Sequence, residues 1–479
     1  MIIAVTLNAI FCDSIKHDKK ALSIPLPASI TNLLSDLSHY KDKRLLTIFC
    51  FGMASGFPWV MIGSALTAWL KDGGLSRGSI GLFGAIFAVY SINFLWSPLL
   101  DRLKPPLIGS LLGQRRSWIA ITQWGIAGCC IAMASLKLDD LFLIALCGLL
   151  IAICSATQDI AIDAYRIDII ADSEKQKLSA ASAMATAGWW TGYGGMGAIP
   201  FFLADAPGWE WHQVYYVLAA LMLLIHVAVW FVREPQTHRE KQQADAAEFY
   251  QQKLSSMGKS NPINTLIAWL IVTLVEPFKE FFSRNGVRFA LSVLLFIFLF
   301  KIGEAFLGRM SIVFYKELGF TNSDIGTLSK LLNWWVTIIF AVIGGLVNMR
   351  YGIYRGLMIA GIAMAASNVM FSVMANVGPS KPLFIATIII DGFCAAWSSV
   401  ALVAFISLLC NKAFSASQYA LMASLGVLGR TVLASSSGFM VDGLDGNWSL
   451  FFIITALMVI PSLLFLYSIR DRINTLEAR

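Results

Sequence analysis

The feature that most constrains this chain is a series of twelve apolar runs, each close to the roughly 20 residues that a helix needs to cross a membrane. Six precede a polar stretch: Leu45–Leu70, Ser79–Leu100, Ser117–Ser135, Leu141–Tyr165, Leu178–Ala204 and Val214–Phe231. Six follow it: Val287–Val313, Ile325–Val347, Gly356–Ala375, Leu383–Leu409, Ala420–Met440 and Leu450–Ile469. This pattern predicts an all-α membrane protein of two six-helix bundles.

Charged residues are scarce for a chain of 479 residues. Only 14% of the residues are charged and 57% are hydrophobic, whereas a soluble protein carries about 25% charged residues. A water-facing surface cannot be built from so few charges. We therefore expect membrane lipid to surround most of the chain.

Composition also excludes several classes of function. The net charge of +7 is typical of a membrane protein with basic cytoplasmic loops, and no basic stretch interleaves with aromatic residues as a nucleic-acid surface would. The eight cysteines form no CxxC pair, so no disulfide framework or zinc site is indicated. The five histidines are scattered, without a nucleophile motif beside them. We expect no nucleic acid, metal or other cofactor, and no enzyme.

Basic residues gather in alternate loops, which sets the orientation. The basic positions are Lys41, Lys43, Arg44, Arg102, Lys104, Arg115, Arg116, Lys175, Lys177, Arg350, Arg355, Lys412, Arg470 and Arg472. Because cytoplasmic loops carry the excess of lysine and arginine, both termini are expected in the cytoplasm.

The domain plan follows from these runs. We expect an N-terminal tail (1–44), a first bundle (45–233), a cytoplasmic linker (234–285), a second bundle (286–470) and a C-terminal tail (471–479). The apolar run Met1–Phe11 is too short to span and is expected to be loose or interfacial. Within the linker, Ile263–Phe278 could be a thirteenth span. Glu276 and Pro277 interrupt it, and a further crossing would turn later basic loops outward, so an interfacial amphipathic helix is expected.

The fourth run carries an unusual group of polar residues. Asp159, Asp163 and Arg166 are spaced i, i+4 and i+7 and share one helix face, with Gln158 beside them. Two carboxylates one turn apart in a low dielectric repel each other, and both burial and repulsion favour proton uptake. We expect Asp159 and Asp163 to serve in proton coupling and Asp159 in substrate binding. The alternative is a structural gate in which Asp163 and Arg166 pair with Arg102 or Arg115.

The second half carries four further charges in apolar runs: Lys301, Glu304, Asp391 and Arg430. Such residues mark transport pathways unless they are paired. Lys301 and Glu304 could neutralise each other on one helix, or Lys301 could exchange between Glu304 and Asp391. We expect Glu304 and Asp391 in proton coupling and Lys301 in substrate binding. Arg430 could bind a substrate carboxylate or form a structural ion pair.

The fifth run is rich in glycine and aromatic residues around Trp189 and Tyr193. Its glycines allow close helix packing. Trp189, Trp190 and Tyr193 could stack on sugar rings, although for any one tryptophan lipid or core contact is the favoured explanation. Trp189 and Tyr193 are kept as candidate substrate residues.

Two loops in equivalent places echo each other. Asp101-Arg102 followed by Gln114-Arg115-Arg116 comes after the second run, and Asn348, Arg350 and Arg355 come after the eighth. Both resemble the short basic loop that major facilitator proteins place between the second and third helices of each half. Asp101, Arg102, Arg115 and Arg166 are expected to form a gate.

Several local sequences resemble the AmpG muropeptide permeases of the major facilitator superfamily. They are Gly52–Pro58, Phe94–Arg102, Ser155–Tyr165, Lys301–Phe306, Leu409–Gln418 and Gly429-Arg430. The resemblance implies a major facilitator fold of twelve helices and proton-driven import of anhydro-muropeptides across the inner membrane. It also implies Gln158, Asp159 and Asp163 as leading substrate and proton residues. Asn93 departs from the family, in which lysine is frequent at this position.

Two other functions remain open from the sequence. One is a facilitator of another anion, such as an acyl-CoA. The other is a membrane sensor that binds without transport and signals through the linker helix. A monomer is expected in each case.

Overall fold

The computed structural model describes residues 39–75, 83–175, 177–235, 273, 275–320, 324–434 and 436–478. The chain divides into Met1–Lys41, of which only the 3-10 helix η1 (His39–Lys41) is described, and a larger unit, Asp42–Arg479. The features below belong to the larger unit. The run Met1–Phe11 lies outside the described residues, as does most of the predicted linker helix Ile263–Phe278.

The first half of this unit consists of the helices before the linker. They are α3 (Lys43–Gly56), η2 (Val60–Ala65), α4 (Leu66–Asp72), η3 (Gly84–Ala88), α6 (Val89–Ile92), η4 (Asn93–Leu95), α7 (Ser97–Arg102), α8 (Ile108–Leu112), α9 (Gln114–Ala134), α10 (Leu141–Ile169), η5 (Asp172–Glu174), α11 (Lys177–Trp190), η6 (Thr191–Gly195), η7 (Met196–Ala198), α12 (Ile199–Ala204) and α13 (Trp211–Phe231).

The end of the predicted linker, the second half and the C-terminal tail supply the other described helices. They are α16 (Glu276–Asn285), α17 (Val287–Phe300), α18 (Ile302–Glu317), η8 (Ile325–Leu332), α20 (Asn333–Tyr351), α21 (Ile353–Val377), α22 (Lys381–Leu409), η9 (Lys412–Phe414), α23 (Ser415–Ala434), α24 (Ser437–Gly443), α25 (Trp448–Leu457), α26 (Ile460–Ser468) and α27 (Arg470–Ala478). No strand occurs among the residues that the structure describes.

Ten helical segments in the described part of the chain are long and apolar enough to cross a membrane. They match ten of the twelve predicted spans. The second and fifth predicted spans are helical but irregular: the second is divided by the 3-10 turns η3 and η4, and the fifth contains π-helix η6 and 3-10 helix η7. Glycine accounts for part of this irregularity, because it weakens the regular α-helix.

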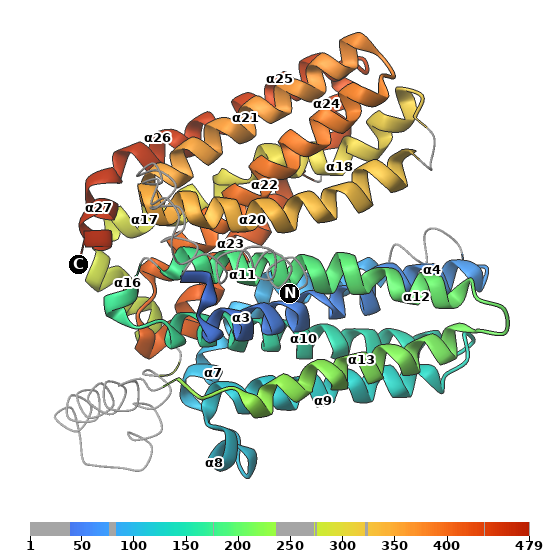
Figure 1. Ribbon diagram of the computed structural model, residues 1–479, viewed down its shortest axis with the longest axis vertical. Coiled ribbons are helices and arrows are strands. Elements are labelled where there is room, and N and C mark those ends of the chain that lie inside the picture. Colours follow the sequence, from blue (N-terminus) through green and yellow to red (C-terminus); the bar gives the residue numbers. More distant parts are fainter. Residues whose placement is uncertain are drawn as a thin grey trace, which may run out of the picture. The chain divides into compact units, whose positions relative to one another are not determined.

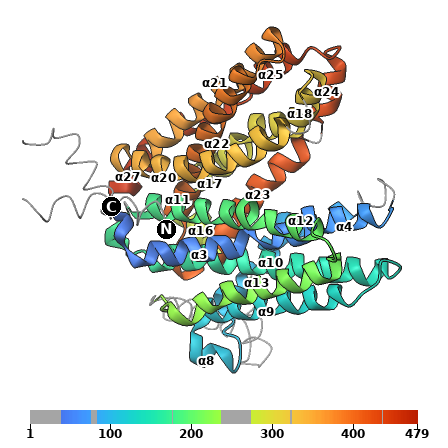
Figure 2. The ribbon, with the colours of Figure 1, turned by 45° about the vertical axis from the view of Figure 1, so that its right-hand side comes forward.

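The two halves approach each other at one end and diverge at the other. In both views the ribbons lie close at the end that carries α16 and α27, and separate toward α4 and α24 (Figures 1 and 2). Helix α11 packs on α20 and α22, and α23 packs on α6, α7 and α10. Apolar clusters also cross between the halves, since Ile167 joins a second-half core and Ala416 and Ala420 join a first-half core.

Glycines bring α3 and α11 unusually close. A Cβ atom at Gly188 would lie 2.2 Å from the Phe49 carbonyl oxygen, and one at Gly56 would lie 2.1 Å from the Trp189 carbonyl oxygen. A backbone carbonyl group cannot move aside for an added methyl as a flexible side chain can. The prediction that glycines of the fifth span allow close packing is therefore confirmed at Gly188.

We expect Gly188→Ala to lower the free energy of unfolding by about 1–3 kcal/mol, because the added methyl forces α3 and α11 apart. Thermal unfolding in detergent measures the effect. Gly128→Ala is the matched control, since a Cβ at Gly128 meets nothing within 4 Å. Equal melting temperatures for Gly188→Ala and the unmodified protein would contradict the packing argument.

Candidate functional site

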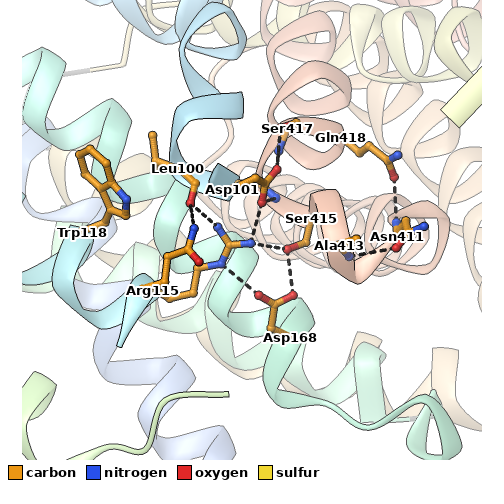
Figure 3. A network of polar contacts seen from close by, with 12 residues as sticks. Leu100, Asp101, Arg115, Trp118, Asp168, Asn411, Ala413, Ser415, Ser417 and Gln418 are labelled. Carbon is orange, nitrogen blue, oxygen red and sulfur yellow. Dashed lines mark hydrogen bonds and ion pairs between the residues drawn. The ribbon is translucent and has the colours of Figure 1, made fainter. Parts of the chain in front are cut away.

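A buried arginine lies at the junction of the two halves. The Arg115 side chain is fully buried at the start of α9. Its Nη2 donates to Asp101 Oδ1 at 2.7 Å and its Nε donates to Asp168 Oδ2 at 3.0 Å. Its Nη1 donates to the Leu100 carbonyl oxygen at 3.1 Å (Figure 3). A charge removed from water needs this degree of pairing.

The second half completes this network through the first turn of α23. Ser415 Oγ accepts from Arg115 Nη2 at 2.8 Å and donates to Asp168 Oδ1 at 2.8 Å. The backbone N–H groups of Ala416 and Ser417 donate to Asp101 at 3.2 and 2.8 Å, and Ser417 Oγ donates at 2.5 Å (Figure 3). Asp101 thus supplies the negative charge that a helix N-terminus favours.

We name this network the latch: Asp101, Arg115, Asp168, Ser415 and Ser417. The sequence analysis singled out Asp101 and Arg115 as candidate gate residues. It missed Asp168, which follows the predicted end of the fourth span and is 4% exposed in the structure. The latch fixes α7, α9 and α10 of one half to α23 of the other, so this end cannot open while it is intact.

Arg166 forms a second contact between the halves. It is fully buried, its Nη2 donates to Asp163 Oδ1 at 3.0 Å, and its Nη1 donates to Ser407 Oγ of α22 at 2.7 Å. Its guanidinium carbon lies 5.1 Å from the ring centroid of Tyr419 on α23. The pairing of Asp163 is therefore with Arg166 on its own helix, whereas Arg115 pairs with Asp101 and Asp168.

Arg102 occupies the last turn of α7, next to Asp101 in the chain. Its residue is half-buried. Burial lowers the pKa of the Arg102 guanidinium below the ordinary value of arginine. Its place beside the latch agrees with the predicted position of the gate.

Asp159 and Gln158 face different neighbours on α3. Asp159 Oδ1 accepts from Ser55 Oγ at 2.7 Å. Gln158 is fully buried, and its Nε2 donates to the Ala54 carbonyl oxygen at 2.7 Å. Its Oε1 is buried with no hydrogen-bond partner, a costly arrangement. In this conformation Gln158 joins two helices, while Asp159 is only partly buried.

The predicted charges of the second half form one group around a break in the seventh span. Lys301 separates α17 from α18, and its Nζ donates to Glu304 Oε2 at 2.5 Å and to Ser398 Oγ at 2.8 Å. Asp391 accepts from Ser367 Oγ at 2.9 Å. Lys301 is 4% exposed, while 28% of the Glu304 side chain is exposed.

Arg430 lies near this group. The residue is exposed, and its Nε donates to the Gly426 carbonyl oxygen of its own helix at 3.3 Å. Its charge is close enough to interact with Glu304 and Lys301. Hydrogen bonds pair Lys301 with Glu304 rather than with Asp391, and the proposed exchange of partners stays a prediction.

The predicted aromatic residues belong to a larger aromatic cluster in the first half. Trp189 stacks on Tyr193 with ring centroids 5.0 Å apart and meets Trp59 edge-on at 6.0 Å. Trp59 also lies 4.5 Å from Tyr90. The sequence missed Trp59. Its position one helical turn after Ser55, which contacts Asp159, is the signal that could have found it.

The structure thus brings the predicted residues together in three groups. The latch and Arg166 form the first, the aromatic cluster together with Asp159, whose charge interacts with Tyr90, forms the second, and the charges around Lys301 form the third. Across the described residues, no cluster of three or more histidine, cysteine or acidic side chains could hold a metal ion. The chemistry available is ion pairing, hydrogen bonding and proton exchange.

Asp168→Asn is expected to lower the free energy of unfolding by about 3 kcal/mol, because it leaves the buried Arg115 with one carboxylate fewer. Thermal unfolding in detergent checks this. Asp205→Asn is the control, since Asp205 is exposed, and its effect should stay within about 0.5 kcal/mol. Should Asp168→Asn unfold as the unmodified protein does, the latch contributes nothing to holding the halves together.

Comparison with known proteins agrees with this fold. The model of the Major Facilitator Superfamily matches residues 46–323. The chain is 34% identical over 439 residues to a transporter of Rickettsia conorii named AmpG 4, covering 91% of this chain and 98% of that protein. It is 29% identical over 438 residues to the anhydromuropeptide permease of Escherichia coli K12, covering 91% and 81%.

Solved structures show the same fold at low sequence identity. The proton:xylose symporter XylE superposes with a TM-score of 0.61 at 15% identity, covering 88% of this chain and 94% of that one. The transporter FucP in its outward conformation gives a TM-score of 0.62 at 15% identity, covering 88% and 98%. The predicted all-α fold and the absence of enzymatic function are confirmed, and the chain belongs to the Major Facilitator Superfamily, with relatives named AmpG.

Proposed function

We propose that this transporter imports anhydro-muropeptides, disaccharides of N-acetylglucosamine and anhydro-N-acetylmuramic acid with short peptides, from periplasm to cytoplasm for cell-wall recycling. The observation that supports this choice of cargo is the similarity to the E. coli anhydromuropeptide permease over 91% of this chain. The membrane is the bacterial inner membrane, and the protein acts as a monomer.

The distribution of basic loops orients the molecule. The latch end carries Arg102, Arg115, Lys175 and Lys412, and the excess of positive charge belongs in the cytoplasm. Both termini then lie in the cytoplasm, and the described conformation is closed on that side. Import requires the latch to break, so that the halves rock about a site between them.

The three groups divide the work of binding and coupling. The cargo combines sugar rings with carboxylates, and two of the three groups of residues offer suitable partners for these parts. Trp189 and Tyr193 offer aromatic faces to the sugars, and Arg430 with Lys301 offers positive charge to a carboxylate. Gln158, whose buried carbonyl oxygen is unsatisfied, becomes available to the cargo when α3 and α10 shift.

Proton coupling falls to carboxylates in the spans. Asp159 and Asp163 lie one turn apart on α10 and interact electrostatically, and neutralising either one removes a charge before the site faces inward. Glu304 and Asp391 form the corresponding pair in the second half, because their charges also interact. Breaking the pair of Asp163 with Arg166 would link proton uptake to the opening of the halves.

Asp159→Asn should reduce proton-driven uptake into membrane vesicles about tenfold or more while retaining exchange of cargo down its gradient, because asparagine cannot bind and release the proton. The measurement is uptake as a function of pH with and without an imposed proton gradient. Asp205→Asn serves as the control outside the spans. A normal rate with an unchanged pH profile in Asp159→Asn would remove the coupling role of this carboxylate.

The cargo itself is tested in proteoliposomes. Excess anhydro-muropeptide should compete for uptake of labelled muropeptide and drive its counterflow, whereas acetyl-CoA should not, because the site pairs aromatic faces with a few charges. Preferential competition by acetyl-CoA would favour an acyl-CoA facilitator. Binding without counterflow would instead identify a sensor.

A further inference from the structure

Just beyond the last span of each half lies a glutamate that holds the first turn of that half's third helix. In the first half, Glu234 accepts the backbone N–H of Arg115 at 2.7 Å and of Arg116 at 3.1 Å, at the start of α9. In the second half, Glu477 accepts the backbone N–H groups of Ile353 and Tyr354, at the start of α21. Both carboxylates sit where a helix favours negative charge.

The same glycine geometry accompanies both glutamates. Gly113 (φ +84°) precedes α9 and Gly352 (φ +86°) precedes α21, and glycine adopts this backbone conformation readily. A Cβ at Gly113 would lie 2.4 Å from Glu234 Cγ, and one at Gly352 would lie 3.0 Å from Glu477 Oε2. Glycine cannot cap the helix with a side chain, so the distant glutamate supplies the cap. The same glutamate cap thus recurs at equivalent helices of the two halves, α9 and α21.

The two caps differ in what they hold. Glu234 fixes the backbone of Arg115, the centre of the latch. Glu477 fixes α27, a nine-residue helix that follows the last span. Ile473 of α27 is fully buried and shares a core cluster with Ile353 and Leu357 of α21. Helix α27 is therefore docked on the second half by both apolar contact and its acidic cap.

The last turn of α27, which carries Glu477, also contacts the first half. Lys175, between η5 and α11, donates from Nζ to the Leu476 carbonyl oxygen at 3.2 Å. A cation at the C-terminal carbonyls complements the helix dipole. The Lys175 loop is itself held in place, because Arg44 donates to Glu174 at 2.8 Å and Lys177 donates to it at 2.6 Å. Hydrogen bonding from Arg44 lowers the pKa of Glu174 to about 2, so Glu174 is ionised at neutral pH.

We propose that α27 is a strap between the halves: Glu477 anchors it on α21, Lys175 of the first half grips its last turn, and together they favour the conformation that is closed at the latch end. The strap rests on the proposed function only in requiring that the halves open and close. Helix α27, expected from the sequence as a simple tail, thereby sets how readily the carrier opens to the cytoplasm.

Distance measurement between spin labels tests the strap on the full chain without cargo, so its outcome does not depend on the muropeptide assignment. Labels at Ser173→Cys and Tyr351→Cys, both at exposed positions on opposite halves, report the separation at the latch end after the eight native cysteines are replaced. Glu477→Ala and Lys175→Ala should each raise the ratio of long to short separations about threefold, the effect of losing one hydrogen-bonded contact.

Two variants make the result specific. Asp471→Asn lies on the same helix, with 89% of the Asp471 side chain exposed, and should leave the ratio unchanged. Lys175→Arg keeps a positively charged donor at this position and should give the same ratio of long to short separations as the unmodified protein. If Glu477→Ala fails to fold, Lys175→Ala and its rescue by arginine decide the question alone. An unchanged ratio in Lys175→Ala would overturn the strap.

Discussion

The structure depends on a charge that is buried where its two halves meet. Arg115 is removed from water at a cost that only its surroundings offset, and those surroundings come from both halves: Asp101 and Asp168 from one, and Ser415 with the first turn of α23 from the other. Because the network needs both halves for completion, separation at this end exposes or unpairs several groups at once. The closed arrangement is thus specified by polar contacts as well as by apolar packing.

Polar groups inside the spans are likewise held by partners on neighbouring helices. Asp159 is held by Ser55 of α3, and Lys301 lies at the break between α17 and α18, where its ammonium reaches Glu304 and Ser398. Each half thus places charged groups within a span that is predominantly apolar. A carrier that alternates between two closed ends needs such groups to change partners, since groups that stay satisfied in every state cannot couple cargo to protons.

Helical periodicity predicted the features that depend on spacing within a single helix. It gave the apolar spans and the one-helix pair of Lys301 with Glu304, and it grouped Asp163 with Arg166, because these depend on spacing within a helix. It could not predict the network around Arg115, in which Asp168 of the same half and Ser415 of the other half meet: Asp168 and Ser415 are 247 positions apart in the chain, and only the fold brings them together. Hydropathy predicted the second and fifth spans but not the 3-10 and π-helical turns within them.

The central claim is that cargo crosses only when the halves separate at the latch end. A short bifunctional thiol reagent that joins Ser173→Cys to Tyr351→Cys, cleavable by reduction, tests this directly by measuring muropeptide uptake into proteoliposomes. The account predicts that uptake stops when the halves are joined and returns after reduction. Uptake that continues at its full rate with the link intact would contradict it.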